Sequence, residues 1–226
     1  MKSYIKRLLQ KKEKNSPMLA MFISNLRKIK TLLCGGGIKI VNHGVGKFKK
    51  DIIGRGNVLV IGKGTSIQES NIRIRGNNNR IIIGENCRIR KNCSFWITGD
   101  NSAIILGNNV TMQHANHFNT NEGRMITVGD DCMLANNIII RTSDDHGIFD
   151  MKTKVRLNAA KDVAIGKHVW IAPNSRIMKG VIVGEGAVIG SNAMVTRDIP
   201  SNALAVGIPA KVVKENIIWS HSIYEI

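Results

Sequence analysis

The sequence predicts an all-β protein in which short parallel strands wind into a solenoid. Large aliphatic residues recur at every sixth position in the stretch 163–195, and a small or β-branched residue follows four positions after each of the first five. Aromatic residues make up only 4% of the chain, and glycine (22 residues) far outnumbers proline (4 residues). A period of six matches neither an amphipathic helix nor an isolated strand. It fits a coil with three short sides and three tight corners.

The hexapeptide period makes a specific prediction for each position. We expect the large residue to point into the coil and the small residue to fill the space beside a corner. Glycine at 166, 184 and 190 suits a positive φ or a close approach of neighbouring backbones. One hexapeptide cannot bury its own apolar side, so successive coils must stack. The large positions are Ile165, Ile171, Ile177, Val183, Ile189 and Val195, and the small ones are Val169, Ser175, Val181, Ala187 and Ala193.

Composition limits the classes of partner. The 226 residues include 43% hydrophobic residues, which is enough for a core, and carry a formal net charge of +17. Such a charge indicates an anionic partner: nucleic acid, an acidic membrane surface, an acidic polysaccharide or a phosphorylated cofactor. No nucleic-acid-binding motif accompanies it. No signal peptide or apolar run of transmembrane length is apparent, so we expect a cytoplasmic protein.

Residues 1–34 form the first predicted unit, a basic helical extension. Two apolar patches at helical spacing flank Ser16-Pro17, where Pro17 can open a second helix. Such helices could lie at the inner face of an anionic membrane. Alternatively, they could pack on the end of the solenoid or on a neighbouring subunit.

The predicted solenoid occupies residues 38–200. In its first half the repeat is longer, because the pairs Ile61-Gly62, Ile83-Gly84, Leu106-Gly107 and Val128-Gly129 are separated by 22, 23 and 22 residues. We assign the excess over a bare coil to corners at 77–79 and 121–123. Cys87 and Cys132 fall on small-residue positions and should pack as small hydrophobic residues. The four cysteines show no spacing typical of a metal site or a disulfide framework.

The repeat breaks at 141–162, which we interpret as a loop inserted at one corner. Insertions of this kind often carry function, because the coil beneath holds them rigidly. This loop contains His146 next to Asp144 and Asp145. After Val195, Ile199-Pro200 and Ile208-Pro209 are expected to stop the coil. Residues 201–226 are the third predicted unit, a C-terminal tail.

Three segments carry a family resemblance: DCMLANNIIIRTSDDHGIFD from Asp131, KDVAIGKHVWIAPNSRIMKGV from Lys161 and ALAVGIPAKVVKENIIW from Ala203. They resemble the bacterial capsular-polysaccharide O-acetyltransferases, and among these the sialic-acid capsule O-acetyltransferases. The resemblance implies a left-handed parallel β-helix, acetyl-CoA as co-substrate and a homotrimer with sites shared between subunits. It implies no metal.

The resemblance also assigns roles to single residues. His146 matches the catalytic histidine, which would take the proton of a sugar hydroxyl as it attacks the thioester. Either Asp144 or Asp145 could orient it. Trp170 matches an active-site tryptophan that could hydrogen-bond the thioester and exclude water. The cofactor-binding positions carried over from broader relatives are Pro173, Ser191, Thr196, Arg197, Lys211 and Lys214.

Other histidines and cations are open to several interpretations. His114 and His117 could line an acceptor cleft, whereas His168 occupies an outward position expected to be plain surface. Arginine pairs at 73 and 75 and at 88 and 90 alternate along predicted strands, so stacked coils could align them into one basic track toward His146. That track would suit a long anionic acceptor.

Two other functions compete with polysaccharide O-acetylation. One is acetylation of a small acceptor, such as an antibiotic or a simple sugar. The other is a non-catalytic β-helix scaffold, as in the carbonic-anhydrase-like proteins of this fold. The combination of His146, Trp170 and Arg197 argues for the enzyme.

Overall fold

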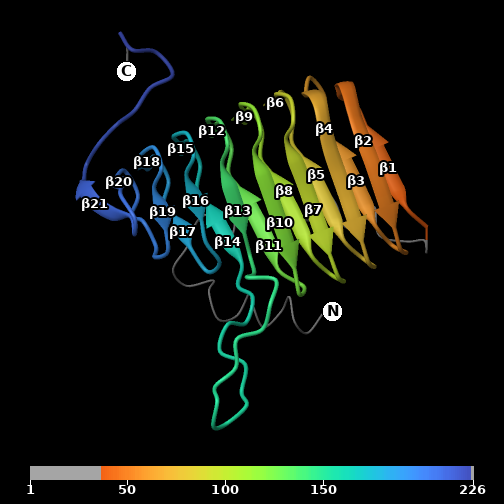
Figure 1. Cartoon of the computed structure of the whole chain (residues 1–226). Coiled ribbons are helices and arrows are strands. Elements are labelled where there is room, and N and C mark those ends of the chain that lie inside the picture. Colours follow the sequence, from red (N-terminus) through yellow and green to blue (C-terminus); the bar gives the residue numbers. More distant parts are fainter. Residues whose placement is uncertain (1–36, 225–226) are drawn as a thin grey trace, which may run out of the picture. The chain divides into compact units, whose positions relative to one another are not determined.

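The computed structural model of the chain describes residues 37–224, so the expected helices in 1–34, Cys34 and the last two residues lie outside the described part. All elements between those limits are strands. They form a parallel β-solenoid of about seven turns, in which each turn contributes strands to three faces (Figure 1). Within these residues no helix is long and apolar enough to cross a membrane.

The first face is a seven-stranded parallel sheet that runs the length of the solenoid. Equivalent residues of successive coils pair directly, as Val58, Arg80 and Ala103 do. In sheet order its strands are β1 (Lys39–Asn42), β3 (Val58–Ile61), β5 (Arg80–Ile83), β8 (Ala103–Leu106), β11 (Met125–Val128), β14 (Val163–Ile165) and β17 (Ile182–Val183).

The second and third faces share the long strand β4, whose first residues pair with β6 and whose last residues pair with β7. The second face comprises β6 (Arg88–Ile89), β9 (Thr111–Met112), β12 (Met133–Leu134), β15 (Trp170–Ile171), β18 (Val188–Ile189), β20 (Leu204–Val206) and the antiparallel β21 (Lys211–Lys214). The third face comprises β2 (Val45–Ile53), β4 (Ser66–Arg75), β7 (Ser94–Thr98), β10 (His117–Asn121), β13 (Ile139–Arg141), β16 (Arg176–Ile177) and β19 (Met194–Val195).

The core confirms the inward direction of the large hexapeptide positions. Ile165, Ile171 and Ile189 are each at most 1% exposed. The small positions are buried as well, and Cys87 and Cys132 lie among them. Burial raises the pKa of the Cys132 thiol to about 12, so this thiol is a packing group and not a nucleophile.

The three corners explain the remaining sequence signals. We call the turn between the first and second faces the first corner, the turn between the second and third faces the second corner, and the turn from the third face back to the first the third corner. At Gly184 a Cβ would meet the Ser201 nitrogen at 2.3 Å, so close backbone approach, and not positive φ, requires this glycine. The expectation that the corners at 77–79 and 121–123 hold the excess length of the early coils was wrong. The excess lies in longer strands, since β10 has five residues where β16 has two.

Two segments depart from the regular coil. Residues 142–162 leave the third corner between β13 and β14 as a long projection, which we call the arm (Figure 1). At the other end, the coil continues past Pro200 because this proline lies at a corner, and β20 adds one more strand to the second face. The expectation that Ile199-Pro200 stops the coil was therefore wrong. The chain turns back at Ile208-Pro209, where β21 pairs antiparallel with β20.

Candidate functional site

His146 lies close to where the arm leaves the solenoid, a region that we call the root of the arm. Its backbone is fixed by Asn158, on the segment of the arm that returns to the solenoid. The Asn158 side chain donates through Nδ2 to the His146 carbonyl oxygen (2.7 Å) and accepts through Oδ1 from the Ile148 amide (2.7 Å). Asn158 is only 8% exposed, whereas the His146 side chain is exposed. The backbone of His146 is therefore fixed, while its imidazole remains accessible to a substrate.

Neither neighbouring carboxylate hydrogen-bonds to the His146 ring. Asp144 forms an ion pair with Lys179 and accepts a hydrogen bond from Asn158 Nδ2 at 2.9 Å. The Lys179 ammonium holds the pKa of Asp144 below its ordinary value. Asp145 accepts from Asn121 Nδ2 at 3.0 Å and has a positive φ of 64°. Within residues 37–224 these carboxylates anchor the root of the arm, and they do not orient the imidazole.

A second ion pair fixes the arm to the coil below it. The Arg156 guanidinium donates to both carboxylate oxygens of Glu122 at 2.8 Å. This bidentate pair lowers the pKa of Glu122 below its ordinary value. Glu122 also accepts from the Ser143 hydroxyl at 3.3 Å. The arm therefore leaves the solenoid through a root that is hydrogen-bonded on both of its strands.

Trp170 lies on the second face, whereas the arm leaves the third corner, which is the corner opposite that face. One subunit therefore does not bring His146 and Trp170 together. Trp170 starts β15, pairs with Met133 and Val188 of the adjacent coils, and is half-buried. Its ring lies 6.1 Å from that of Trp219, at an angle of 45°.

The expected cofactor residues also separate into groups. Pro173 and Ser191 stack on adjacent coils at the second corner, where the Asn192 amide donates to the Pro173 carbonyl oxygen at 2.9 Å. Thr196 and Arg197 lie at the third corner, the same corner as the arm. The last group is Lys211 and Lys214, which bound the exposed strand β21.

The other candidate histidines occupy different places. His114 lies at the second corner, in the column of coils that contains Pro173 and Ser191. His117 starts β10 on the third face, and its Nδ1 lies 2.6 Å from the Ser94 hydroxyl oxygen. His117 thus faces the same side of the solenoid as the strand that leads into the arm.

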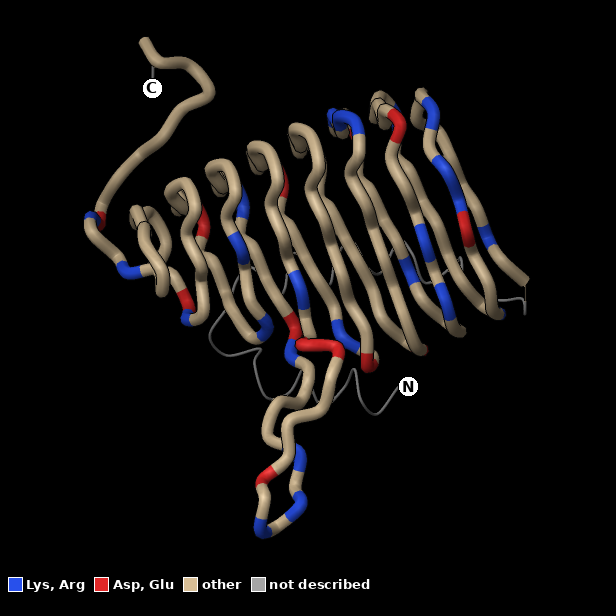
Figure 2. Tube along the Cα trace, in the orientation of Figure 1, with Lys and Arg blue, Asp and Glu red and all other residues tan. Residues whose placement is uncertain are grey.

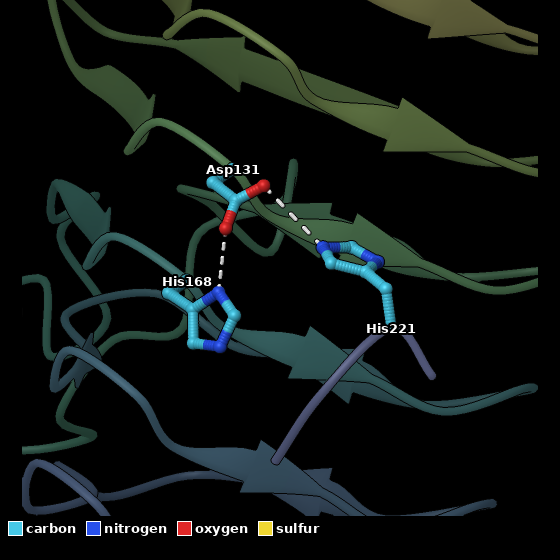
Figure 3. Close-up of side chains that lie close together, drawn as sticks. All are labelled: Asp131, His168 and His221. Atoms are coloured by element: carbon cyan, nitrogen blue, oxygen red, sulfur yellow. Dashed lines mark hydrogen bonds and ion pairs between the residues drawn. The ribbon is translucent and has the colours of Figure 1, made fainter. Parts of the chain in front are cut away.

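His168 is not plain surface, contrary to its expected role. Its Nδ1 lies 2.6 Å from Asp131 Oδ2, its Nε2 lies 3.0 Å from the Trp219 carbonyl oxygen, and the Trp219 ring stacks on it at 4.1 Å. His221 approaches the other carboxylate oxygen of Asp131 at 3.3 Å (Figure 3).

Among the described residues, Asp131, His168 and His221 form the one group of three possible metal ligands, with donor atoms within 4.8 Å of one another. A contact of 2.6 Å between Asp131 and His168 is a direct hydrogen bond. Both ring nitrogens of His168 are thereby engaged with protein groups.

The basic residues of the early coils do not form one track. Arg73 and Arg75 lie on the part of β4 that pairs with β7, on the third face, whereas Arg88 belongs to the second face. The expectation that all four arginines align was wrong, because the corner after β6 turns the chain by one face. Figure 2 shows lysine and arginine spread over the early coils and at the tip of the arm.

A shorter row does lead along the third face to the arm. Strand register aligns the outward residues Arg73, Trp96, Asn119 and Arg141 on four adjacent strands. The Arg73 guanidinium lies over the Trp96 ring at 5.8 Å, and Trp96 is 42% exposed. Asp51 pairs with Arg73 at 3.7 Å at the far end of the row. We call these four residues the third-face row.

Comparison with known proteins gives the same family from sequence and from structure. Residues 162–197 match the family model for the bacterial transferase hexapeptide (six repeats), and residues 80–113 match that for the hexapeptide repeat of succinyl-transferase. A polysialic acid O-acetyltransferase of Neisseria meningitidis is 35% identical over 181 residues, which cover 76% of this chain and 80% of the relative. The chain belongs to the hexapeptide-repeat O-acetyltransferases.

Other relatives agree with this assignment. A polysialic acid O-acetyltransferase of Escherichia coli O1:K1 / APEC is 44% identical over 97 residues, but the match covers only 32% of that relative and 43% of this chain. The crystal structure of the polysialic acid O-acetyltransferase OatWY superposes with a TM-score of 0.77 at 32% identity, covering 83% of this chain and 89% of that one. The polySia-specific acetyltransferase NeuO gives a TM-score of 0.59 at 32% identity, covering 81% and 91%.

The sequence interpretation missed the residues that hold the site in place. Asn158 and Lys179 are polar residues whose partners lie up to 35 positions away, so no local pattern marks them. His168 did carry a signal. At the equivalent first corners the chain has Asn86, Asn109, Asp131, Gly186 and Asn202, which suit a positive φ. A histidine in that column indicates a role beyond the turn.

Proposed function

We propose that the enzyme transfers an acetyl group from acetyl-CoA to a hydroxyl group of an acidic bacterial surface polysaccharide, with His146 as general base. The observation that carries this proposal is the third-face row, which brings an arginine, an exposed indole, an amide and a second arginine up to the strand from which the arm departs. The relatives named above as polysialic acid O-acetyltransferases support an acidic sugar polymer as acceptor.

The chemistry requires a base and no enzyme nucleophile. The His146 imidazole accepts the proton of the acceptor hydroxyl as the oxygen attacks the thioester carbonyl carbon. When the tetrahedral intermediate collapses, the carbon–sulfur bond breaks and the same proton can pass to the CoA thiolate. The buried thiols at 87, 93 and 132 are not available for a covalent intermediate, and burial raises the pKa of each of them.

A homotrimer of left-handed solenoids would complete the site. Because His146 and Trp170 lie on different sides of one subunit, a neighbouring copy must supply one of them. The arm carries exposed apolar side chains that a second copy could cover, namely Ile148, Phe149, Met151, Val155 and Leu157, which are 57–84% exposed. Trp170 of the neighbour would then exclude water from the thioester.

Acetyl-CoA would bind in the groove between subunits. The stacked corner of Pro173 and Ser191 offers backbone groups to the pantetheine, and the exposed cations Arg197, Lys211 and Lys214 suit the phosphates of CoA. The site would need no metal. The enzyme would act in the cytoplasm, where the basic residues 1–33 suit the inner face of an anionic membrane.

The shape of the third-face row fits a polymer better than a small acceptor. Four adjacent strands span about 14 Å at the usual strand spacing, which exceeds one sugar ring. An exposed indole gives a sugar ring an apolar platform, and arginine pairs with a carboxylate in bidentate geometry. Asp51 forms its closer ion pair with Arg75 and lies 3.7 Å from Arg73 Nε, so most of the Arg73 guanidinium is left for an acidic sugar.

A matched pair of variants tests the acceptor class. Arg73→Gln/Arg141→Gln removes the charges of the third-face row, and Arg88→Gln/Arg90→Gln removes two exposed arginines outside that row. We expect the first variant to raise the KM for a long acidic polysaccharide about tenfold at low salt, and less at high salt. The second should change it less than about twofold. Equal effects of the two variants, or an equal loss on a monosaccharide acceptor, would contradict the proposal.

Mixed oligomers test the shared site. His146→Ala and Trp170→Ala subunits are each expected to be nearly inactive alone. Unfolded together and refolded as mixed oligomers, they should regain a substantial part of the activity, because some interfaces then combine an intact histidine with an intact tryptophan. Failure to regain activity in oligomers of proven mixed composition would place both residues in one subunit.

A further inference from the structure

The C-terminal segment Ile217–His221 is bonded back onto the first corner of an earlier coil. The Ile217 amide donates to the Asn202 carbonyl oxygen at 2.9 Å, and the Trp219 indole N–H donates to the His168 carbonyl oxygen at 2.7 Å. Trp219 is 8% exposed, although the preceding Ile218 is 71% exposed. One side chain therefore anchors an otherwise exposed tail, and we call 217–221 the clip.

The His168 ring is held at both ring nitrogens and on one face. Its Nδ1 faces the Asp131 carboxylate at 2.6 Å and its Nε2 faces the Trp219 carbonyl oxygen at 3.0 Å. The Trp219 ring stacks on it at 4.1 Å and 9°. One side chain therefore joins the clip to the first corner.

Charged groups surround His168 at the same corner. Asp131 provides the nearest negative charge, and His221 shares that carboxylate at 3.3 Å while its ring meets Trp219 edge-on at 4.9 Å. At the same corner Lys167 pairs with Asp130 at 3.5 Å. Glu185 occupies the equivalent place of Lys167 on the next coil.

The clip also touches the residue that the proposed function places beside the thioester. Trp219 lies 6.1 Å from Trp170, ring centre to ring centre, and the stacked His168 ring belongs to the corner that leads into β15. Trp170 is therefore packed between its own strand and a side chain delivered from near the C-terminus. Loss of the Trp219 contact would leave the Trp170 indole free to rotate.

We propose that His168 and Trp219 are positioning residues for Trp170, because together they hold the clip on the first corner beside β15. This inference rests on the proposed function, because it assumes that Trp170 acts in acetyl transfer.

One substitution removes the imidazole without disturbing the corner. Asn86, Asn109 and Asn202 occupy equivalent corners at φ of 55–58°, close to the 49° of His168, so His168→Asn should fold normally. Acrylamide quenching of tryptophan emission then reports the clip directly. The difference in emission between the wild-type chain and Trp219→Phe isolates Trp219.

In the wild-type chain Trp219 should be shielded from acrylamide, and in His168→Asn it should be quenched several-fold more. Free quenching of Trp219 in the wild type, or wild-type shielding in the variant, would overturn the clip. This readout does not depend on activity, so it decides the clip even if acetyl transfer to polysaccharide were disproved.

Kinetics test the positioning role separately. His168→Asn and Trp219→Phe should lower kcat/KM for acetyl-CoA by about threefold to tenfold and increase hydrolysis of acetyl-CoA relative to transfer, because a displaced indole admits water. Ile223→Ala, in the same tail and at an 86% exposed position, is the matched control. An open clip with unchanged transfer would show that Trp219 does not position Trp170.

Discussion

Asn158 offers the sharpest test of how the arm presents His146. Its side chain makes four hydrogen bonds: it donates to Asp144 Oδ2 (2.9 Å) and the His146 carbonyl oxygen (2.7 Å), and it accepts from the Ile148 amide (2.7 Å) and Arg156 Nε (3.3 Å). Asn158→Ala removes all four. A typical hydrogen bond contributes about 1 kcal/mol net.

Two of the four partners retain other bonds, since Asp144 keeps Lys179 and Arg156 keeps Glu122. We therefore expect Asn158→Ala to destabilise the hydrogen-bonded root of the arm by about 2 to 3 kcal/mol. This corresponds to a factor of about 30 to 150 in the equilibrium between its closed and open forms. The expected result is a loss of kcat of about tenfold to a hundredfold, with KM for acetyl-CoA changed less than about twofold.

Steady-state release of CoA with saturating acceptor measures this effect. Thr153→Ala is the control, because it deletes the bond from the Thr153 hydroxyl to Asp150 (2.9 Å) at the exposed tip of the arm and touches nothing near His146. A second variant, Asn158→Asp, keeps one acceptor oxygen but sets a carboxylate against Asp144, and should lose as much activity at pH 7. A folded Asn158→Ala with normal kcat would refute the assignment of Asn158 as the support of His146.

Three further predictions follow from the site. Arg197→Ala or Lys211→Ala should raise KM for acetyl-CoA more than it lowers kcat, and the effect should shrink as salt increases; an unchanged KM at low and high salt would show that these are surface cations. Lys179→Gln should return the lowered pKa of Asp144 toward its ordinary value. The stability from a lowered carboxylate pKa is present above the unfolded value of about 4 and is lost as the pH falls through the folded value. The urea midpoints of variant and wild type should therefore differ at pH 7 and draw together as the pH falls below about 4. A Cys34→Ser variant should not react with a thiol reagent in its folded state, because Cys87, Cys93 and Cys132 are buried; prompt modification of any of them would contradict the packing of the coils.

The sequence predicted the solenoid well because its period is local. Within each hexapeptide the large aliphatic residue marks the position that points inward, and Ile165 and Ile171 are buried as this pattern predicts. The arm was also visible, since polar residues from 141 onward break an otherwise regular pattern. The positions of His146 and Trp170 on different sides of the subunit could not be predicted from spacing, because the strands change in length along the solenoid, from five residues in β7 and β10 to two in β16.

The supporting residues were hidden for a different reason. The partners of Asn158 and Lys179 are set by how the two strands of the arm meet, and those of Trp219 by a turn of the tail at Ile208-Pro209. The prediction of a single basic track failed for a similar reason. Alternation along a strand shows that Arg73 and Arg75 share a side, but whether Arg88 lies beside them depends on which face of the solenoid its strand joins.

The central claim is that this enzyme acetylates a hydroxyl of an acidic polysaccharide through His146. The most direct measurement incubates the purified protein with acetyl-CoA labelled with carbon-13 in the acetyl group and an acidic capsular polysaccharide, with an uncharged polysaccharide as the parallel acceptor. Carbon-13 NMR then detects O-acetyl ester on the polymer, and CoA release is counted in the same sample. The account predicts ester on the acidic polymer in a one-to-one ratio with released CoA, and a loss of about two to four orders of magnitude in His146→Ala. Ester formation by a folded His146→Ala at the wild-type rate, or on the uncharged polymer alone, would contradict it.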